Sequence, residues 1–433
     1  SVALTSVLRN NPIPTVKVPY SNQAEKQVYV YKGENTDLTF TANDDTTVKD
    51  MYLRGPGDVN WNNTEAFGFT TGKIDNGVVT GKGTISDNKQ EATITMTGET
   101  NLDAGKQWTS YVVANDNDNF SSMPADRNFN ALDIDPDAKS KPGYIRFVVK
   151  DQTSKYDIKD LTDSTRITVN DINNVTDAEL TTIKSRLQLE HSQKSNDARF
   201  VRGAAVANPT SLIDTVAVST TEPSKLVVTY IDGSTDTIEK NKVLNVRPKG
   251  NIPFSNPNTK EIYVYKGEET NIELSATDDS GKIKDIRIAE GGRGNNAPGA
   301  AGGRIRNQYG LTTGYQRNET GIEATETNPA KVTITGTVSV SGQPNFTGNL
   351  MTRYLVAEDL EGATFSDPNG NSDSGKTVDQ VPEGWFKLVV REQTQKYDIQ
   401  GQTEESNKIA VSDVNNLSTE DFEKIKNNIK IQY

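Results

Sequence analysis

The sequence contains no cysteine among its 433 residues. This absence excludes disulfides, thiolate nucleophiles and zinc sites with cysteine ligands. Animal extracellular β-proteins of this size often carry cysteines, whereas surface proteins of Gram-positive bacteria commonly carry none. The absence therefore favours a bacterial surface protein, and a cytosolic protein stays open.

Histidine is almost absent as well, because His191 is the only one. A Ser-His-Asp triad would have one available base, and a multi-histidine metal site would have none. His191 lies in the polar stretch EHSQKSND, which predicts a solvated surface side chain rather than a catalytic base.

The sequence also lacks long apolar runs and an excess of positive charge. No run approaches the ~18 apolar residues of a membrane helix, and the N-terminus has no basic-then-apolar secretion signal. We therefore expect no membrane insertion, and a mature segment or a piece of a longer protein. Lys and Arg total 47 against 59 Asp and Glu, a net charge of −12, which repels phosphate backbones. We expect no nucleic-acid partner.

What the sequence does contain is a set of short alternating runs of Val, Ile, Tyr and Thr, bounded by Asn, Asp, Gly and Pro. Mean hydropathy is −0.67. These patterns are typical of a soluble β-protein with long polar loops.

The most informative feature is an internal repeat. VYVYKGENTDLTFTANDD (28–45) matches IYVYKGEETNIELSATDD (262–279), and SYVVANDND (110–118) lies opposite RYLVAEDLE (353–361). Further on, FVVKDQTSKYDI (147–158) matches LVVREQTQKYDI (388–399). The second copy has a longer glycine-rich loop at 290–304. No helix is predicted after this loop, so we interpret it as a flexible surface loop and not a phosphate cradle.

Each copy contains a strand-rich unit followed by a helix. The strand pattern favours a sandwich, and a barrel stays open. Capping boxes at Thr176/Glu179 and Ser418/Asp421 predict where the two helices begin. We expect both helices to bury the same apolar stripe, formed by Leu180, Ile183 and Leu187 in the first and by Phe422, Ile425 and Ile429 in the second.

After the first helix, Asp232-Gly233 lies between alternating runs and predicts a hairpin within a three-stranded sheet. We expect this sheet to face the helix with Val216, Val218, Val227 and Tyr230. The predicted fold is mainly β with a small α+β module: tandem Ig/cadherin-like β-sandwich units separated by a helix-plus-hairpin module. The expected divisions are the tail of a preceding module (1–19), a sandwich (20–164), the small spacer module (165–247), a second sandwich (248–405) and the start of a truncated second module (406–433).

VNDINNVTDAELTTIK followed by LVVTYIDGSTDTI resembles the helix-plus-hairpin modules of Gram-positive cell-wall-anchored surface proteins. The larger units, with VAEDLEG and VVREQT, resemble the Ig- or cadherin-like repeats of the same proteins. Among these, the sequence is most similar to the staphylococcal giant extracellular-matrix-binding proteins, although the best-known parts of that family are helical bundles. The resemblance implies an extracellular location at the cell surface or cell wall.

Acidic turns follow aligned strands in both copies. If these loops meet, their oxygens would suit calcium, although Asn and Asp also occur in turns for purely local reasons. Calcium is the only cofactor considered, and its candidate ligands are Asp44, Asp45, Asp116, Asp278, Asp279 and Asp359. Paired carboxylates also leave a glycoside-hydrolysing module as the alternative function.

Exposed aromatic residues offer another route to recognition. Trp61, Phe67 and Tyr309 come before a motif, TTG, that occurs in both copies at 70–72 and 312–314. Side chains at these positions either anchor a partner or cap the core.

A repeat without a catalytic constellation works through length, number or valency. We therefore predict a non-enzymatic stalk or adhesive segment of a bacterial surface protein. We expect a monomeric rod whose partner is a host matrix protein or a glycan, with a role in cell adhesion and virulence.

Overall fold

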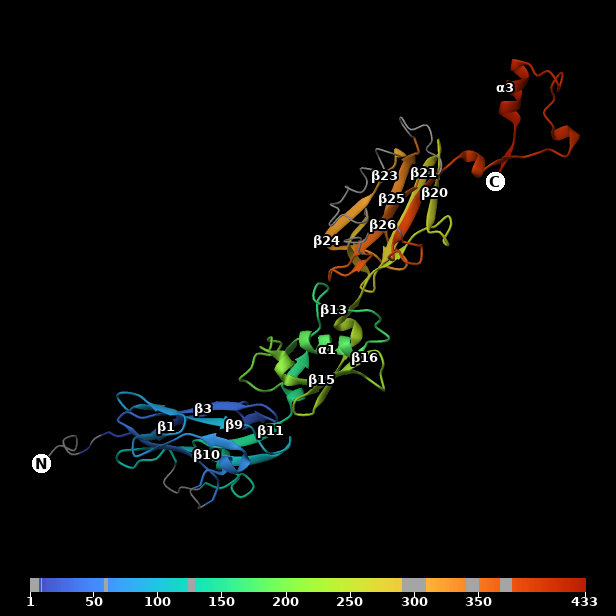
Figure 1. Cartoon of the computed structure of the whole chain (residues 1–433). Coiled ribbons are helices and arrows are strands. Elements are labelled where there is room, and N and C mark those ends of the chain that lie inside the picture. Colours follow the sequence, from blue (N-terminus) through green and yellow to red (C-terminus); the bar gives the residue numbers. More distant parts are fainter. Residues whose placement is uncertain are drawn as a thin grey trace. The chain divides into compact units, whose positions relative to one another are not determined.

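The computed structural model describes residues 8, 10–57, 61–123, 129–289, 309–339, 350–366 and 376–433. The glycine-rich loop at 290–304, predicted as flexible, lies outside the described residues. The chain forms two compact units (Figure 1), and neither is a continuous segment. The first unit comprises Ser1–Leu161 and Val175–Val243, and the second comprises Thr162–Asn174 and Leu244–Tyr433. No helix in the described part of the chain has the length and apolar character needed to cross a bilayer.

The first unit contains a β-sandwich (Figure 1). One sheet has the order β1 (Thr15–Lys17), β3 (Thr36–Asn43), β9 (Glu91–Gly98) and β5 (Phe69–Thr71), with β8 (Gly83–Ile85) paired to β9. The other has the order β2 (Gln27–Tyr31), β11 (Tyr144–Lys150), β10 (Gln107–Asp116), β4 (Val48–Arg54), β6 (Lys73–Asp75) and β7 (Val78–Thr80). Alternate residues such as Phe40, Ile94 and Val112 form the buried core between the sheets.

The second unit repeats this arrangement. Its sheets have the orders β19 (Lys249–Asn251), β21 (Glu269–Thr277), β25 (Ala330–Thr337), β23 (Thr312–Thr313), and β20 (Glu261–Tyr265), β28 (Trp385–Arg391), β26 (Leu350–Glu358), β22 (Lys282–Ala289), β24 (Tyr315–Glu323). β27 (Thr364–Phe365) pairs with β26. In both units the first strand of the larger sheet is an edge strand that pairs parallel to its neighbour. The predicted β-sandwich class is confirmed, and the main strands of the two sandwiches have the same order.

The aromatic residues before the TTG motif divide between the two predicted roles. Phe67 lies in the 3₁₀ helix η2 (Asn63–Phe67) with its ring centroid 4.7 Å from that of Trp108, and Tyr309 is only 1% exposed. These two residues cap the core. Trp61 is 48% exposed and keeps the alternative role of a surface side chain.

The small module in the first unit is built from α1 (Asp177–Arg186) and the antiparallel sheet β15 (Ile213–Val218), β16 (Lys225–Tyr230), β17 (Thr235–Glu239). The capping box of Thr176 and Glu179 is present, and the Asp232-Gly233 turn joins β16 to β17 as predicted. The predicted facing residues are right for Val216, Val218 and Tyr230, since Val218 is half-buried opposite the buried Leu226, and wrong for Val227, whose place on this face is taken by Leu226 and Val228. Val227 is an odd number of residues from Tyr230, so it lies on the other side of the strand.

The module is bound to the first sandwich by polar contacts within the first unit. The fully buried Gln152 receives a hydrogen bond from the Asp232 N–H (2.9 Å), and its own N–H donates to the Asp232 carboxylate (2.6 Å). β12 (Tyr156–Ile158) pairs with β14 (Leu189–His191). His191 is half-buried against the Phe200 ring (4.6 Å), so the predicted solvated surface histidine is wrong, and burial lowers its pKa.

The second helix, α3 (Thr419–Asn428), also begins at its predicted capping box, between Ser418 and Asp421. Its apolar stripe differs from that of α1, since Phe422 is 59% and Ile429 is 37% exposed whereas Ile183 is fully buried. The expectation that both helices bury the same stripe is therefore wrong. The physical reason is that α1 packs against β15 of the sheet β15–β17, whereas the strand after α3, β30 (Ile431–Gln432), pairs with β29 (Asp398–Ile399).

A short parallel pair belongs to the second unit: β13 (Ile167–Val169) with β18 (Leu244–Val246). The pair brings the segment Thr162–Asn174 into the second unit although it comes earlier in the sequence than α1. It positions Arg166 and Asn245 beside the acidic turns of the second sandwich.

Candidate functional site

In the first unit, the acidic turns satisfy their own backbone. The Asp44 carboxylate accepts hydrogen bonds from the N–H groups of Thr46 and Thr47, both 2.8 Å. Asp45 is exposed. The fully buried Asp116 accepts from the Phe120 N–H (2.8 Å) and from Asn11 Nδ2 (2.7 Å). The bonds to Thr46, Thr47 and Phe120 are the local turn chemistry that was the alternative to calcium, whereas the bond from Asn11 joins residues far apart in the sequence.

In the second unit, the aligned carboxylates lie beside a positively charged side chain of the protein, the guanidinium of Arg166. Asp359 accepts from Asn245 Nδ2 (2.8 Å), as Asp116 does from Asn11 in the first copy. Arg166 donates to Glu361 (2.8 Å), and its guanidinium lies 3.7 Å from the Asp279 carboxylate. We call Arg166, Asp279, Asp359 and Glu361 the arginine clasp. Asp278 lies beside it and accepts from Ser280.

The arginine clasp was missed in the sequence because Arg166 is separated from Glu361 by 195 residues. The hydrogen bonds that Asn11 and Asn245 donate had a weak signal in the sequence, because the segment 7–14 resembles the segment 243–253. The paired carboxylates that raised a hydrolase as the alternative are held by an arginine and an amide in the second unit. That arrangement suits a structural contact.

Calcium binding at the six aspartates stays a prediction. Within the described ranges, no group of three or more Asp, Glu or His side chains is arranged to hold a metal ion. If calcium binds the native protein, Tm in millimolar calcium exceeds Tm in EDTA, by mass action. Coincident melting curves in the two buffers would remove this prediction.

The arginine clasp predicts a pH-dependent stability. Burial raises the pKa of Glu361 to about 7, against an opposing effect of Arg166. A raised pKa favours the protonated group in the folded state, so the stability it contributes is present below its ordinary pKa and is lost as pH rises through about 7. We expect the free energy of unfolding of the second unit to be higher at pH 5 than at pH 8, by up to about 3 kcal/mol, as measured by denaturant titration.

The control for this pH experiment is built into the repeat. Glu361→Gln is expected to reduce the pH dependence and to leave the part due to Asp278, whose pKa burial raises to about 6, whereas Asp118→Asn, at the aligned position of the first unit, is expected to leave the second unit's transition unchanged. Equal pH dependence in Glu361→Gln and the unchanged chain would show that Glu361 is not the titrating group.

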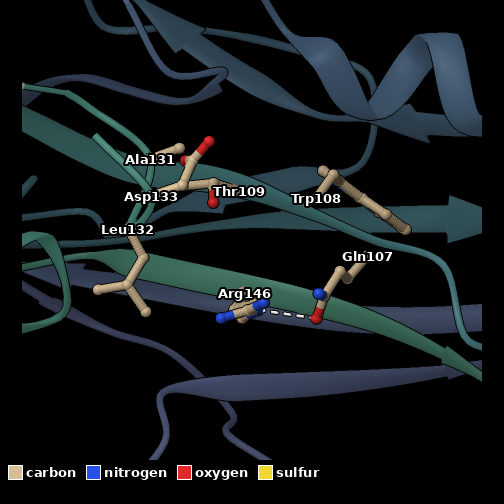
Figure 2. Close-up of a pocket in the computed structure, with 7 residues that line it drawn as sticks. All are labelled: Gln107, Trp108, Thr109, Ala131, Leu132, Asp133 and Arg146. Atoms are coloured by element: carbon tan, nitrogen blue, oxygen red, sulfur yellow. Dashed lines mark hydrogen bonds between the residues drawn. The ribbon is translucent and has the colours of Figure 1, made fainter. Parts of the chain in front are cut away.

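The first sandwich has a pocket of about 530 Å³ on the outer face of its larger sheet, beside the connection from β10 to β11 (Figure 2). Thr109 and Arg146 are cross-strand partners, and Arg146 Nε donates to Gln107 Oε1 (2.8 Å). The residues that line the pocket are Gln107, Trp108, Thr109, Ala131, Leu132, Asp133 and Arg146.

The side chains that line this pocket suit a polar ligand. Arg146 is half-buried and presents a guanidinium, the side chain best shaped for a carboxylate. The Trp108 ring is packed into the core against Phe147, with ring centroids 4.8 Å apart, and is only 7% exposed. Recognition there would rest on hydrogen bonds and charge more than on stacking.

The aligned positions of the second sandwich divide between the two faces of its larger sheet: Lys387 replaces Arg146 on the outer face, whereas Arg353, whose cross-strand partner is the buried Phe386, is on the core side. Thr352 and Lys387 are cross-strand partners on β26 and β28, at the positions aligned with Thr109 and Arg146. Directly after Thr352, Arg353 stands at the position aligned with Ser110 of the first sandwich. Arg353 is 2% exposed and donates to the Thr352 carbonyl (2.6 Å). A guanidinium is the side chain best shaped for a carboxylate, which makes this position a candidate site.

Comparison with known proteins bears on this second sandwich. Residues 252–368 match the GspA/SrpA SigLec-like domain family. No curated protein matches the sequence. The match supports the expected class, a surface adhesin of a Gram-positive bacterium, and an adhesive segment of such a protein. It does not support the resemblance to the staphylococcal giant matrix-binding proteins, which was too specific.

Solved structures show similar β domains. The sialic acid binding region of an adhesin from Streptococcus sanguinis SK1, bound to 3'sLn, is 20% identical, with a TM-score of 0.38, over 97% of this chain and 87% of that one. The SrpA adhesin from Streptococcus sanguinis is 20% identical, with a TM-score of 0.32, over 55% of this chain and 96% of that one. TM-scores below 0.5 do not establish a common arrangement of the whole chain.

Proposed function

We propose that this chain is a non-catalytic adhesive segment of a bacterial surface protein and that its second sandwich binds an acidic host glycan. The match of residues 252–368 to the SigLec-like domain family carries the proposal. The designation refers to lectins of sialic acid, a sugar that bears a carboxylate. The chain's location is then extracellular, on the surface of the cell.

The guanidinium group on β26 supports an acidic sugar as the ligand. Arg353 is the proposed partner of the carboxylate, since a guanidinium donates two parallel hydrogen bonds to such a group. Thr352 and Lys387, which pair across the two strands, lie on the opposite face of the sheet from Arg353 and are not part of this site.

The pocket of the first sandwich is proposed as a second, weaker site. Arg146 supplies one guanidinium there, but Ser110 stands at the position of Arg353 and donates to Asn63 (2.7 Å). Two linked sites of unequal affinity would together bind a glycan-covered surface more tightly than either alone.

The test is binding of the full chain to matched glycans with and without a terminal sialic acid, with fibronectin, fibrinogen and collagen as separate arms. We expect binding to the sialylated glycan and loss after sialidase treatment. Equal binding to both glycans would overturn the acidic-sugar proposal, and binding to a matrix protein alone would overturn the glycan proposal.

A further inference from the structure

A second pocket of the first sandwich, of about 520 Å³, lies on the outer face of the larger sheet, over β4 and β6. It is separate from the pocket beside Arg146, which is lined from β10, β11 and the connection between them. The charged side chains that line the second pocket are Asp50, Glu65, Asp75 and Lys73. Three carboxylates therefore share the pocket with one ammonium group. We call it the acidic pocket.

Two of these carboxylates lie opposite each other on neighbouring strands. Met51 on β4 pairs with Ile74 on β6 in antiparallel register, and both side chains are buried in the core. Asp50 and Asp75, the adjoining residues, are therefore cross-strand neighbours on the outer face. Like charges at such positions repel each other, which destabilises the pair.

The first sandwich compensates these two negative charges only in part. The Asp50 carboxylate accepts hydrogen bonds from two neutral donors, the Asn76 N–H (2.8 Å) and Asn115 Nδ2 (3.4 Å). Lys73 Nζ lies 3.9 Å from the Asp75 carboxylate, and the two side chains are 55% and 73% exposed. Solvent weakens an ion pair as exposed as this one. A further cation in the pocket would therefore be stabilised by both aspartates.

The second sandwich places guanidinium groups of its own at the equivalent position. Asp285, which aligns with Asp50, is fully buried and forms an ion pair with Arg287, two residues further along β22. Arg317 on β24 is the cross-strand partner of Asp285 and stands where Asp75 stands in the first sandwich. Its Nη1 lies 4.0 Å from the Asp285 carboxylate. A guanidinium is thus the group that this position of the fold holds when the chain itself supplies one.

We infer that the acidic pocket binds the guanidinium group of an arginine side chain from another protein. Tyr52 stands at the position of Arg287, so a tyrosine and Asp75 replace the two arginines of the second sandwich. Asp50 and Asp75 accept hydrogen bonds from the guanidinium, whose planar fork suits carboxylates. The half-buried Tyr52 ring offers an aromatic face to the cation.

The occupant is an arginine within a polypeptide and not the free amino acid. Free arginine would bring a carboxylate of its own to a pocket that already has an excess of negative charge, and like charges at short range repel. This inference does not depend on the proposed glycan binding, because the acidic pocket lies in the first sandwich and Arg353 lies in the second.

The test adds the peptide acetyl-Gly-Gly-Arg-Gly-Gly-amide to the full chain, and chemical shifts of the β4 and β6 amides report binding. One matched peptide carries citrulline, the neutral isostere of arginine, and another carries lysine. We expect the arginine peptide to shift these resonances at millimolar concentration and the citrulline peptide to leave them unchanged. The lysine peptide is expected to bind more weakly, because an ammonium group does not present a planar fork to the two carboxylates.

A variant of the pocket and a matched control locate the binding. Asp75→Arg, which supplies the residue type of Arg317, is expected to weaken binding of the arginine peptide at least about tenfold, because it replaces an attractive charge with a repulsive one. Asp87→Arg makes the same change of charge at an exposed position outside the acidic pocket, and it is expected to keep the affinity.

The inference is overturned if the arginine peptide leaves β4 and β6 unshifted, or if the citrulline or the lysine peptide binds equally well. Equal weakening by Asp75→Arg and Asp87→Arg would also overturn it, since the peptide would then respond to net charge alone. Concentration-dependent dimerisation that Asp75→Arg abolishes would do so as well, because the occupant would then be a second copy of this chain.

Discussion

Replacing Arg353 with Ser, the residue at the aligned position of the first sandwich, is expected to weaken binding of a sialylated glycan at least about 100-fold. Each hydrogen bond to a charged group contributes about 1.5–3 kcal/mol, and about 1.4 kcal/mol corresponds to a tenfold change in Kd. The loss of two such bonds to one carboxylate accounts for the size of the effect. Glycan binding by calorimetry measures it.

The experiment is best done in an Arg146→Ala background, so that the first sandwich does not mask the loss. Arg353→Lys tests whether charge alone suffices, and it is expected to recover only part of the affinity because an ammonium group does not bind a carboxylate through two parallel bonds. Thermal melting checks that the variant is folded. Unchanged affinity in a folded Arg353→Ser variant would place the glycan elsewhere.

Replacing Ile183 with Ala is expected to destabilise the small module by about 2–5 kcal/mol, since it removes a fully buried aliphatic side chain and leaves a cavity. The module has few other large apolar groups on α1 to compensate. Hydrogen exchange of α1 and β15–β17, measured in the full chain, would show the loss. Faster exchange at Gln152 and Asp232 would show that the contact with the first sandwich loosens as well.

The repeat supplies the matched control. Ile425 on α3 aligns with Ile183 but is only half-buried, so Ile425→Ala is expected to cost less than about 1.5 kcal/mol. Equal effects at the two positions would mean that burial by the sheet β15–β17 does not stabilise α1.

Local patterns in the sequence were sufficient to predict the strands, both helix starts and the Asp232-Gly233 turn. These features depend on alternation, capping and turn chemistry among neighbouring residues. Repetition extended the prediction, because the second copy shows the same strand order as the first.

Two of the failures, the burial of Phe422 and the partners of Arg166, concern contacts distant in sequence, whereas the wrong face of Val227 was a local error of strand alternation. The exposure of Phe422 could not be predicted from the apolar stripe that α3 shares with α1, because the burial of a helix residue depends on the sheet that packs against the helix. The position of Arg166 among the carboxylates of Asp279 and Glu361 depends on the pairing of β13 with β18. Short strands of three residues carry too little pattern to predict such a pairing.

The arginine clasp also constrains the order in which the protein can fold during synthesis. The ribosome completes Arg166 long before Glu361, and the remainder of the first unit, Val175–Val243, is made in between. Domains generally fold as they emerge from the N-terminal end. The first unit can therefore reach its native state while the segment around Arg166 still waits for its carboxylates. The clasp closes only when β26 and the turn after it have left the ribosome, so it forms late in the chain's maturation.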